Sequence, residues 1–258
     1  MDQHRNNRRS HSDDDQMVYG IHPVLEAIRA GKEIDRVFIH RGARGEGILQ
    51  VKQLLRDNGI AWQEVPIERL ERFTRKNHQD VVAFTSPVTY QPLEEIIPSL
   101  FERGVTPLIL LLDRITDVRN FGAIARSAEC AGVHAIILPQ KGSVTVTSDA
   151  IRTSAGALNR IPVCRVRDLR QAAFYLRDSG IRIVAATEKA KDHHFEADLA
   201  GPLCIVMGSE EDGISNEMLR VCDQLLRIPM HGSVGSLNVS VAAGILLFEA
   251  VRQRMKEA

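Results

Sequence analysis

Apolar residues in the second half of the chain come in short, nearly continuous runs, each separated from the next by a segment with helical spacing. Such runs are typical of strands that are buried on both faces of a parallel sheet, with helices covering those faces. The expected strands are 108–113, 135–139, 163–166, 181–187, 203–208 and 225–230, and the expected helices are 120–132, 148–158, 169–180, 214–222 and one from 239 onward. The pattern therefore predicts an α/β domain built on a parallel sheet.

The first part of the chain alternates in the same way over a shorter length. It predicts helices at 18–31, 46–59 and 67–76 and strands at 35–40, 61–65 and 80–86. We therefore expect a small α/β domain over 17–90, preceded by a disordered tail over 1–16 in which basic and acidic clusters nearly cancel. Prolines punctuate the segment that follows, so we expect a linker over 91–106 and a second domain over 107–258.

Composition limits the classes of partner. Lys plus Arg and Asp plus Glu both number 33 among the 258 residues, so the formal net charge is zero and any RNA or DNA surface must be a local patch. The four cysteines are scattered without a C-x-x-C pair, which indicates neither a zinc site nor a disulfide framework. No apolar run approaches the roughly 20 residues that span a bilayer. We expect a cytoplasmic protein with reduced thiols, without a bound metal and without a membrane anchor.

One stretch combines a clear helix with polar residues in an apolar setting. From Val239 onward apolar residues recur at three- and four-residue spacing, whereas Gly232, Gly235, Ser236 and Asn238 precede them. Such residues can cap a helix, because their side-chain oxygens accept hydrogen bonds from free backbone N–H groups. They can equally shape a glycine-bent loop around a bound molecule. The stretch by itself leaves capping and ligand binding both open.

Three unusual segments follow expected strands. They are 113–128, 208–215 and 231–240, and they are rich in glycine and in polar or charged residues. In open parallel sheets, ligands bind in the crevice beyond the carboxyl ends of the strands. The sequence therefore predicts a ligand site that these three segments build together.

Taken together, the three segments resemble the three motifs of the SpoU–TrmH branch of the SPOUT RNA methyltransferases. The residues that carry the match are Asn120, Gly122 and Arg126 in an N-x-G-x-x-x-R arrangement, then Gly208, Glu210 and Gly213 in "IVMGSEEDGIS", then Ile228, Pro229, Ser236, Leu237 and Asn238 in "IPMHGSVGSLNVSVAAG". The N-terminal "VYGIHPVLEAIRAG" is similar to the opening of the substrate-binding domain of RlmB-type ribosomal RNA methyltransferases. Asp80 departs from this pattern, because glycine is common at that position.

The resemblance implies methylation of a ribose 2'-hydroxyl in RNA with S-adenosylmethionine as the methyl donor. The implied target is a guanosine in the peptidyl-transferase P loop of 23S ribosomal RNA, with a transfer-RNA ribose as the alternative. The resemblance also implies a deep trefoil knot in the C-terminal domain, an N-terminal domain like ribosomal protein L30e, and a homodimer with composite active sites.

By the same resemblance, the cofactor would be contacted largely through backbone groups of Gly208, Ile228, Met230, Ser236 and Leu237. RNA contacts are expected from Arg119 and from two arginines of a glycine-rich loop, Arg41 and Arg44.

The implied catalytic residues are Arg126, Asn120, Glu210 and Asn238. Arg126 is expected to bind the phosphate and stabilise alkoxide character, because an arginine guanidinium is a poor proton acceptor. Glu210 is expected to position Asn120 or Arg126, and Asn238 is expected to organise the start of the last helix.

Two other classes of protein remain as alternatives. Residues 37–55 form a strand, glycine loop and helix with Glu64 further on, as in dinucleotide-binding oxidoreductases, although the glycines are misordered for G-x-G-x-x-G. A non-catalytic RNA-binding protein with a decayed methyltransferase domain is the other. Titration with S-adenosylmethionine and with a nicotinamide dinucleotide separates the three possibilities.

Overall fold

The computed structural model describes residues 16–257, and the chain divides into two compact units. Unit 1 extends to Thr89, and unit 2 begins at Tyr90. The expected tail at 1–16 lies outside the described residues except for Gln16. Because each unit has its own sheet and its own core, the two are described separately.

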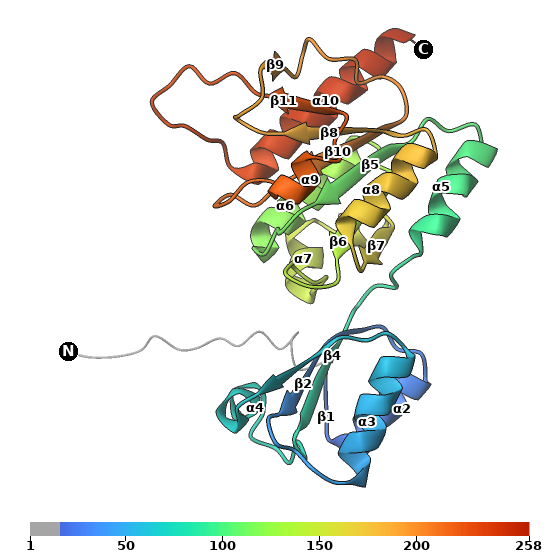
Figure 1. The fold of residues 1–258 in the computed structure, drawn as a ribbon, viewed down its shortest axis with the longest axis vertical. Helices are drawn as coiled ribbons and strands as arrows, with labels where there is room; N and C mark the ends of the chain where they lie inside the picture. The colour runs from blue at the N-terminus through green and yellow to red at the C-terminus, as the bar shows by residue number, and fades with distance from the viewer. Residues whose placement is uncertain (1–15, 258) are drawn as a thin grey trace. The chain divides into compact units, whose positions relative to one another are not determined.

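Unit 1 is a four-stranded sheet with three helices (Figure 1). Its elements are β1 (Met17–Tyr19), α2 (Ile21–Arg29), β2 (Ile34–His40), α3 (Glu46–Asp57), β3 (Trp62–Val65), α4 (Ile67–Phe73) and β4 (Val81–Thr85). The strand order is β1-β4-β2-β3, with β2 and β3 parallel and the other two pairs antiparallel. The helix expected over 18–31 is therefore shorter, because its first residues form the edge strand β1.

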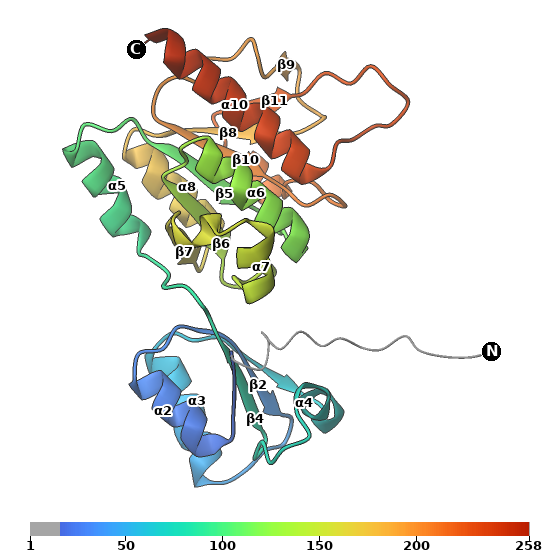
Figure 2. The same ribbon diagram turned by 180° about the vertical axis from the view of Figure 1, so that it is seen from behind.

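The two faces of this sheet are covered differently. Alternate residues of a strand point to opposite faces, and along β2 Val37 and Ile39 pack in the core under α2 and α3, whereas Phe38 packs with α4. Figures 1 and 2 show α4 across the sheet from α2 and α3. At the turn before β4, Asp80 has a φ of 64°, a left-handed conformation that glycine adopts without strain. This geometry fits the glycine that the resemblance predicts at this position.

Unit 2 is built on a seven-stranded sheet whose paired strands all run parallel, as the apolar pattern predicts. The strand order is β7-β6-β5-β10-β8-β11-β9. The strands are β5 (Leu108–Leu112), β6 (Ala135–Pro139), β7 (Val163–Val166), β8 (Arg182–Ala186), β9 (Asp192–His193), β10 (Leu203–Met207) and β11 (Gln224–Arg227). The main helices are α5 (Leu93–Glu102), α6 (Val118–Cys130), α7 (Ser148–Thr153), α8 (Leu169–Asp178), α9 (Asn216–Leu219) and α10 (Val239–Glu257).

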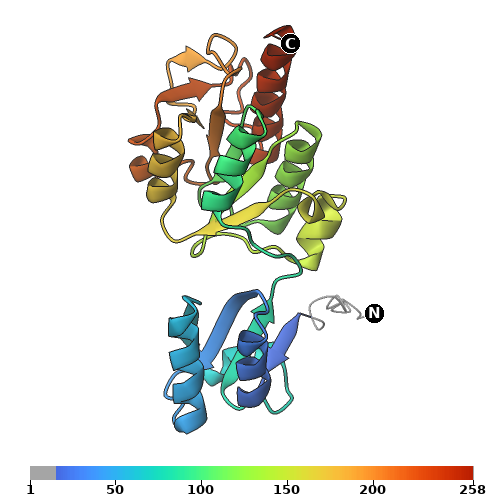
Figure 3. The same cartoon turned by 90° about the vertical axis from the view of Figure 1, so that its right-hand side faces the viewer.

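Helices cover both faces of this sheet, which confirms the expected architecture. Figure 3 shows α5 and α8 on one side of the strands and α6 and α10 on the other. Every residue of β5 and of β10 is buried. Because β5 and β10 are central neighbours, the segments that follow them emerge side by side at the carboxyl edge of the sheet.

The linker expected over 91–106 is corrected by the structure. Most of it forms helix α5, which belongs to unit 2. Leu93, Ile96, Ile97 and Leu100 are buried in the core that α5 shares with α8. Burial of each such side chain contributes about 1.5–3 kcal/mol, so this amphipathic face overcomes the helix-breaking tendency of Pro98.

The end of α10 is fixed to the beginning of the sheet. The Arg254 guanidinium donates hydrogen bonds to the carbonyl oxygens of Thr106 at 3.1 Å, Pro107 at 2.8 Å and Gly201 at 2.8 Å. These carbonyls lie just before β5 and β10. The last helix therefore stabilises the start of two central strands.

Candidate functional site

Residues from the three expected motifs meet at the carboxyl edge of the unit 2 sheet. The Asn238 side-chain amide donates a hydrogen bond of 2.9 Å to Oδ1 of Asn120 and a second to Oε1 of Glu210. Oε1 of Glu210 also accepts from the backbone N–H of Val239 at 3.3 Å. The three side chains come from the segments after β5, β10 and β11, as expected, and Asn238 connects the other two.

The first motif is positioned by the start of α6. Asp117 caps this helix by accepting a hydrogen bond of 2.7 Å from the Asn120 backbone N–H. Gly122 is required by packing, because a Cβ atom there would lie 2.6 Å from Cβ of Thr153 in α7. The close contact between α6 and α7 therefore depends on this motif glycine.

The second motif is a tight loop that folds back on itself. Ser209 and Gly213 exchange backbone hydrogen bonds, and a Cβ atom on Gly208 would lie 2.2 Å from the Gly213 carbonyl carbon. Two residues that the sequence reasoning missed hold this loop. The buried carboxylate of Asp113 accepts from the Ser215 N–H at 2.7 Å, and Arg114 donates to the Gly213 carbonyl at 3.1 Å. Their signal in the sequence is a charged pair directly after an apolar strand.

The third motif ends in the cap of α10. Oδ1 of Asn238 accepts hydrogen bonds from the Ser240 N–H at 2.9 Å and from its hydroxyl at 2.5 Å. The Glu210 carboxylate lies beside the first N–H of α10. Its negative charge interacts favourably with the partial positive charge of the helix N-terminus. Capping thus explains Asn238 and Ser240, whereas Ser236 remains exposed in the preceding loop.

That loop borders a cavity of about 450 Å³ beyond the ends of β8, β10 and β11. All five residues expected to contact a cofactor line it, namely Gly208, Ile228, Met230, Ser236 and Leu237. Sequence reasoning missed Thr187, Glu188 and Lys189, which follow β8 and also line the cavity. Their signal was the expected strand over 181–187, whose carboxyl end lies at the same edge.

The lining of this cavity favours a small cationic molecule with an apolar part. Met207, Ile228 and Leu237 supply apolar surface, whereas the acidic side chains at the rim outnumber the one lysine. These charged residues are Glu188, Glu210, Glu211, Asp212 and Lys189. S-adenosylmethionine fits this chemistry, because the flat faces of its adenine pack against apolar side chains and its sulfonium and ammonium groups outweigh its single carboxylate.

A second hollow adjoins the first. It measures about 340 Å³ and is lined by Arg114, Asp117 and Asn120, and Glu210 and Val239 line both hollows. The hydrogen-bonded side chains of Asn120 and Glu210 thus border the second hollow, while Glu210 also borders the first. Two molecules bound in these hollows would meet at Glu210 and the start of α10.

Two of the predicted arginines do not join this network. Arg126 and Arg119 are exposed on α6, and neither side chain forms a hydrogen bond or ion pair within the described part of the chain. Arg126 follows Asn120 by six residues in the helix, so the two side chains point in directions about 120° apart around the helix axis. Arg126 is therefore available to a molecule outside the chain rather than to its own Asn120 or Glu210.

The remaining predicted RNA contacts lie in unit 1. Arg41 and Arg44 are exposed on the loop between β2 and α3. The loop is fixed at one end, because the Arg41 N–H donates to the Val65 carbonyl at 2.7 Å.

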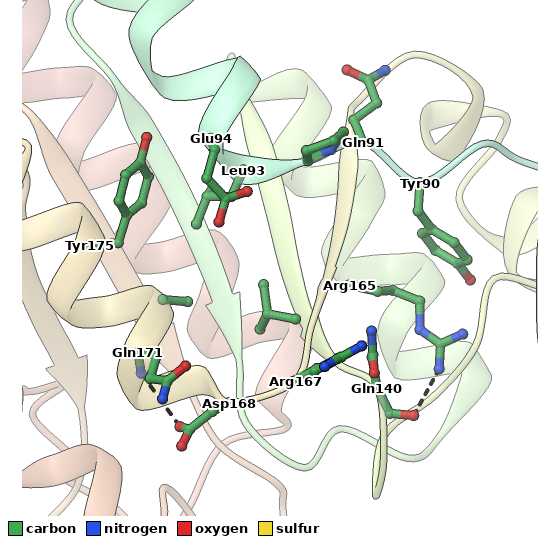
Figure 4. Close-up of a pocket in the computed structure, with 13 residues that line it drawn as sticks. Tyr90, Gln91, Leu93, Glu94, Gln140, Arg165, Arg167, Asp168, Gln171 and Tyr175 are labelled. Atoms are coloured by element: carbon green, nitrogen blue, oxygen red, sulfur yellow. Dashed lines mark hydrogen bonds between the residues drawn. The ribbon is translucent and has the colours of Figure 1, made fainter. Parts of the chain in front are cut away.

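A further cavity of about 450 Å³ lies in unit 2 where β7 ends and α5 and α8 begin (Figure 4). The guanidinium of Arg165 lies 5.1 Å from the ring centre of Tyr90 and donates to the Gln140 carbonyl at 2.9 Å. Asp168 caps α8. None of the motif residues lines this cavity, and β6 and β5 separate β7 from β10. It is thus distinct from the two adjoining hollows.

Neither a metal nor a membrane segment stands out in residues 16–257. No cluster of three or more His, Cys, Asp or Glu side chains is arranged to hold a metal ion there. Within the same range, no helix has the length and hydropathy needed to cross a bilayer.

Comparison with known proteins agrees with the motifs. Residues 107–248 match the SpoU rRNA Methylase family, and residues 17–91 match the family described as RNA 2'-O ribose methyltransferase substrate binding. The chain belongs to the SpoU rRNA methylase family. This membership argues against the dinucleotide oxidoreductase, because the SpoU match includes all three motifs.

Relatives of this SpoU methylase include proteins named as 23S ribosomal RNA methyltransferases. The chain is 38% identical over 241 residues to the 23S rRNA (guanosine-2'-O-)-methyltransferase RlmB of Escherichia coli K12, covering 93% of this chain and 99% of that protein. It is 36% identical over 244 residues to RlmB of Vibrio vulnificus, covering 93% and 98%.

Solved structures of SpoU methylases have the same fold. AviRb from Streptomyces viridochromogenes, in complex with AdoMet, gives a TM-score of 0.59 at 27% identity, covering 97% of this chain and 95% of that one. An AdoMet-bound rRNA methyltransferase from Sinorhizobium meliloti gives 0.58 at 29% identity, covering 92% and 87%.

Proposed function

We propose that this protein transfers a methyl group from S-adenosylmethionine to the 2'-hydroxyl of a guanosine in the peptidyl-transferase P loop of 23S ribosomal RNA. The observation that carries the proposal is the meeting of Asn120, Glu210 and Asn238 between two adjoining hollows. A donor in one hollow and a ribose in the other would be held close together, as a direct transfer requires. The cytoplasm, where ribosomal RNA is assembled, is the proposed location.

Coverage of the relatives favours ribosomal RNA over transfer RNA. The RlmB enzymes of Escherichia coli and Vibrio vulnificus each match 93% of this chain, including unit 1. The TrmH/SpoU tRNA modifying enzyme of A. aeolicus covers only 64% of it. This difference in coverage supports a role for unit 1 in the choice of ribosomal RNA.

In the donor hollow, S-adenosylmethionine would supply an electrophilic methyl group. Gly208, Ile228, Met230, Ser236 and Leu237 would bind it, with Leu237 and Ile228 against the adenine. Asn238 and Glu210 would keep the start of α10 in place beneath it, since their side chains are hydrogen-bonded to each other and to α10.

Arg126 would act on the RNA. Its exposed guanidinium suits a bidentate contact with the phosphate next to the target ribose and would stabilise negative charge on the attacking oxygen. The proton would pass to a phosphate oxygen or to water, because the guanidinium stays charged.

We also propose a homodimer with composite sites. On α10, Val241, Phe248 and Met255 are exposed by 50%, 49% and 76%, and with Ile245 and Arg252 they form a stripe at alternating four- and three-residue spacing. A second copy packed on this stripe would bring its Arg126 toward the cofactor hollow, because α6 packs beside α10. The knot and the L30e-like character of unit 1 are supported by family membership alone.

The test combines cofactor titration with mapping of ribose methylation. Calorimetry should show binding of S-adenosylmethionine but not of a nicotinamide dinucleotide. Ribosomal RNA from cells that lack the protein should lose one 2'-O-methylguanosine in the P loop and regain it on complementation. An unchanged methylation map of 23S and transfer RNA would contradict the proposal.

A further inference from the structure

Aromatic side chains gather where α4 packs on the unit 1 sheet, on the face opposite α2 and α3. We call it the aromatic face, and it consists of Tyr19, Phe38, Phe73 and Phe84 with the basic residues Arg36, Arg69 and Lys76. The ring centre of Phe73 lies 4.9 Å from the ring centre of Phe38 and 5.2 Å from that of Phe84. Phe38 is buried, whereas Tyr19, Phe73 and Phe84 are partly exposed.

Each of the three basic side chains lies over one of these rings. The Arg69 guanidinium is 5.0 Å from the centre of Phe38, Arg36 is 5.4 Å from Phe84, and the Lys76 ammonium is 5.8 Å from Tyr19. They come from three different segments, namely α4, β2 and the turn after α4. The sheet and α4 thus gather three positive charges on one aromatic surface.

These charges lack acidic partners within residues 16–257. Arg36, Arg69 and Lys76 are exposed, and none of them takes part in an ion pair there. The acidic residues Glu68 and Glu71 of α4 project about 100° and about 160° away from Arg69, because successive helical residues are rotated by about 100°. An anionic ligand could therefore satisfy all three without displacing a carboxylate.

Flat rings interleaved with unpaired cations match single-stranded RNA. Bases that are not in a duplex stack on aromatic rings and on guanidinium planes, while Lys and Arg contact the phosphates between them. A duplex presents its phosphates but not its base faces, so it would use the charges alone. The protruding Arg36 and Arg69 extend the ring surface in the way that such stacking requires.

We propose that the aromatic face is an RNA-binding surface of unit 1, and that it takes unpaired nucleotides flanking the methylated position. The proposal rests on the proposed function for the identity of the substrate as ribosomal RNA. It adds a second RNA contact to the expected Arg41 and Arg44, which lie on the loop after β2 and outside this face.

The experiment compares two triple variants of the full-length protein. The aromatic-face variant carries Arg36→Gln, Arg69→Gln and Lys76→Gln, which remove the three positive charges of the aromatic face. The control variant carries Arg29→Gln, Lys32→Gln and Arg56→Gln, which remove the same number of charges from exposed positions on or beside α2 and α3. Affinity is measured by fluorescence anisotropy for a hairpin RNA with an unpaired loop and for a blunt RNA duplex of equal length, over a range of salt concentrations.

The aromatic-face variant should bind the hairpin at least tenfold more weakly, because it loses three charged contacts to phosphates and two guanidinium planes on which bases stack. For this variant, the slope of log Kd plotted against the logarithm of the salt concentration should be smaller by about 2. A decrease of that size corresponds to three lost phosphate contacts. The control variant should bind like the wild type. A conservative Phe84→Leu variant should lose hairpin affinity but keep duplex affinity, because it removes a ring and no charge.

Methylation kinetics provide an independent readout. The aromatic-face variant should raise KM for ribosomal RNA about tenfold with kcat and S-adenosylmethionine affinity unchanged. Equal hairpin binding by the two triple variants would overturn the aromatic-face proposal, even if the wild type methylates 23S RNA normally. Conversely, a wild type that methylates no RNA but binds the hairpin through this face would contradict only the proposed reaction.

Discussion

Asn238 and Asn120 are 118 positions apart in the chain, and their side chains share a hydrogen bond of 2.9 Å at the carboxyl edge of the unit 2 sheet. The same amide of Asn238 also reaches Glu210, and its oxygen caps α10. One side chain therefore links three loops that follow three different strands. Its removal should affect the shape of the cofactor hollow before it affects the reacting groups.

Asn238→Ala should weaken S-adenosylmethionine binding about tenfold, whereas Arg126→Ala should leave it nearly normal. The first variant loses a helix cap of about 1 kcal/mol and the donor to Glu210, which loosens the loop that lines the hollow. The second removes only an exposed side chain outside that hollow. Calorimetry measures both, and both variants should have low turnover. Equal loss of cofactor affinity would show that the division of roles is wrong.

Gly208→Ala should abolish cofactor binding, because its new methyl group would overlap the backbone of Gly213 at 2.2 Å. Gly232→Ala is the matched control in the third motif, where a Cβ atom meets nothing within 4 Å. Thermal unfolding and calorimetry should show a lower Tm and no binding for the first variant only. Normal binding by Gly208→Ala would mean that the loop can relax without consequence.

Two truncations test the boundary of unit 2. A protein of residues 90–258 should fold and bind S-adenosylmethionine but methylate ribosomal RNA poorly, because it lacks unit 1. A protein of residues 107–258 should be unfolded or aggregated, since it loses the buried face of α5. Circular dichroism and cofactor titration separate them. Full activity of residues 90–258 on ribosomal RNA would place recognition outside unit 1.

The dimer proposal predicts that Phe248→Lys yields a monomer, because it puts a charge into the exposed stripe of α10. Phe101→Lys changes an equally apolar residue that is 41% exposed on α5 and should stay dimeric in light scattering. Composite sites predict complementation as well. Mixing Arg126→Ala with Asn238→Ala should restore up to half the activity of wild type per heterodimer, and no recovery would exclude shared sites.

His134 predicts a dependence of stability on pH. Burial, and then the charge of Arg254, lower the pKa of this imidazole, whose Nδ1 accepts from the Leu108 N–H at 3.0 Å. The unfolded chain, with a pKa of about 6.5, takes up a proton first as the pH falls. The stabilisation is complete above about pH 6.5 and decreases below it, with a slope of at most about 1.4 kcal/mol per pH unit.

Urea unfolding at several pH values measures this slope. His134→Asn should flatten it, because an amide oxygen can accept from Leu108 without titrating in this range. His22→Asn, at an exposed position, should leave the wild-type profile unchanged. If His134→Asn follows the wild-type profile, another group governs the acid sensitivity.

Periodicity predicted the parallel sheet and the edge at which the three motifs meet, because both follow from local patterns. The segment expected as a linker over 91–106 differs from the structure for a local reason as well. Pro98 favours a break, whereas the helical spacing of Leu93, Ile96, Ile97 and Leu100 favours the helix that forms. The bonds from Asn238 to Asn120 and Glu210 could not be read from the sequence, because they depend on how distant loops approach. The contact of the Arg36 guanidinium with the Phe84 ring could not be read from the sequence either, because it depends on the pairing of β2 with β4.

The fixing of β5 and β10 by Arg254 has a consequence for synthesis on the ribosome. β5 is made early, yet its neighbour β10 and the arginine that holds both strands come some 100 and 150 residues later. At about 5–20 residues per second, the apolar β5 waits on the order of ten seconds for its partners. Unit 1 has all its elements within the first 89 residues and can fold while unit 2 is still being translated. The two units therefore reach their native structures at separate moments of translation, and the later one depends on the last helix.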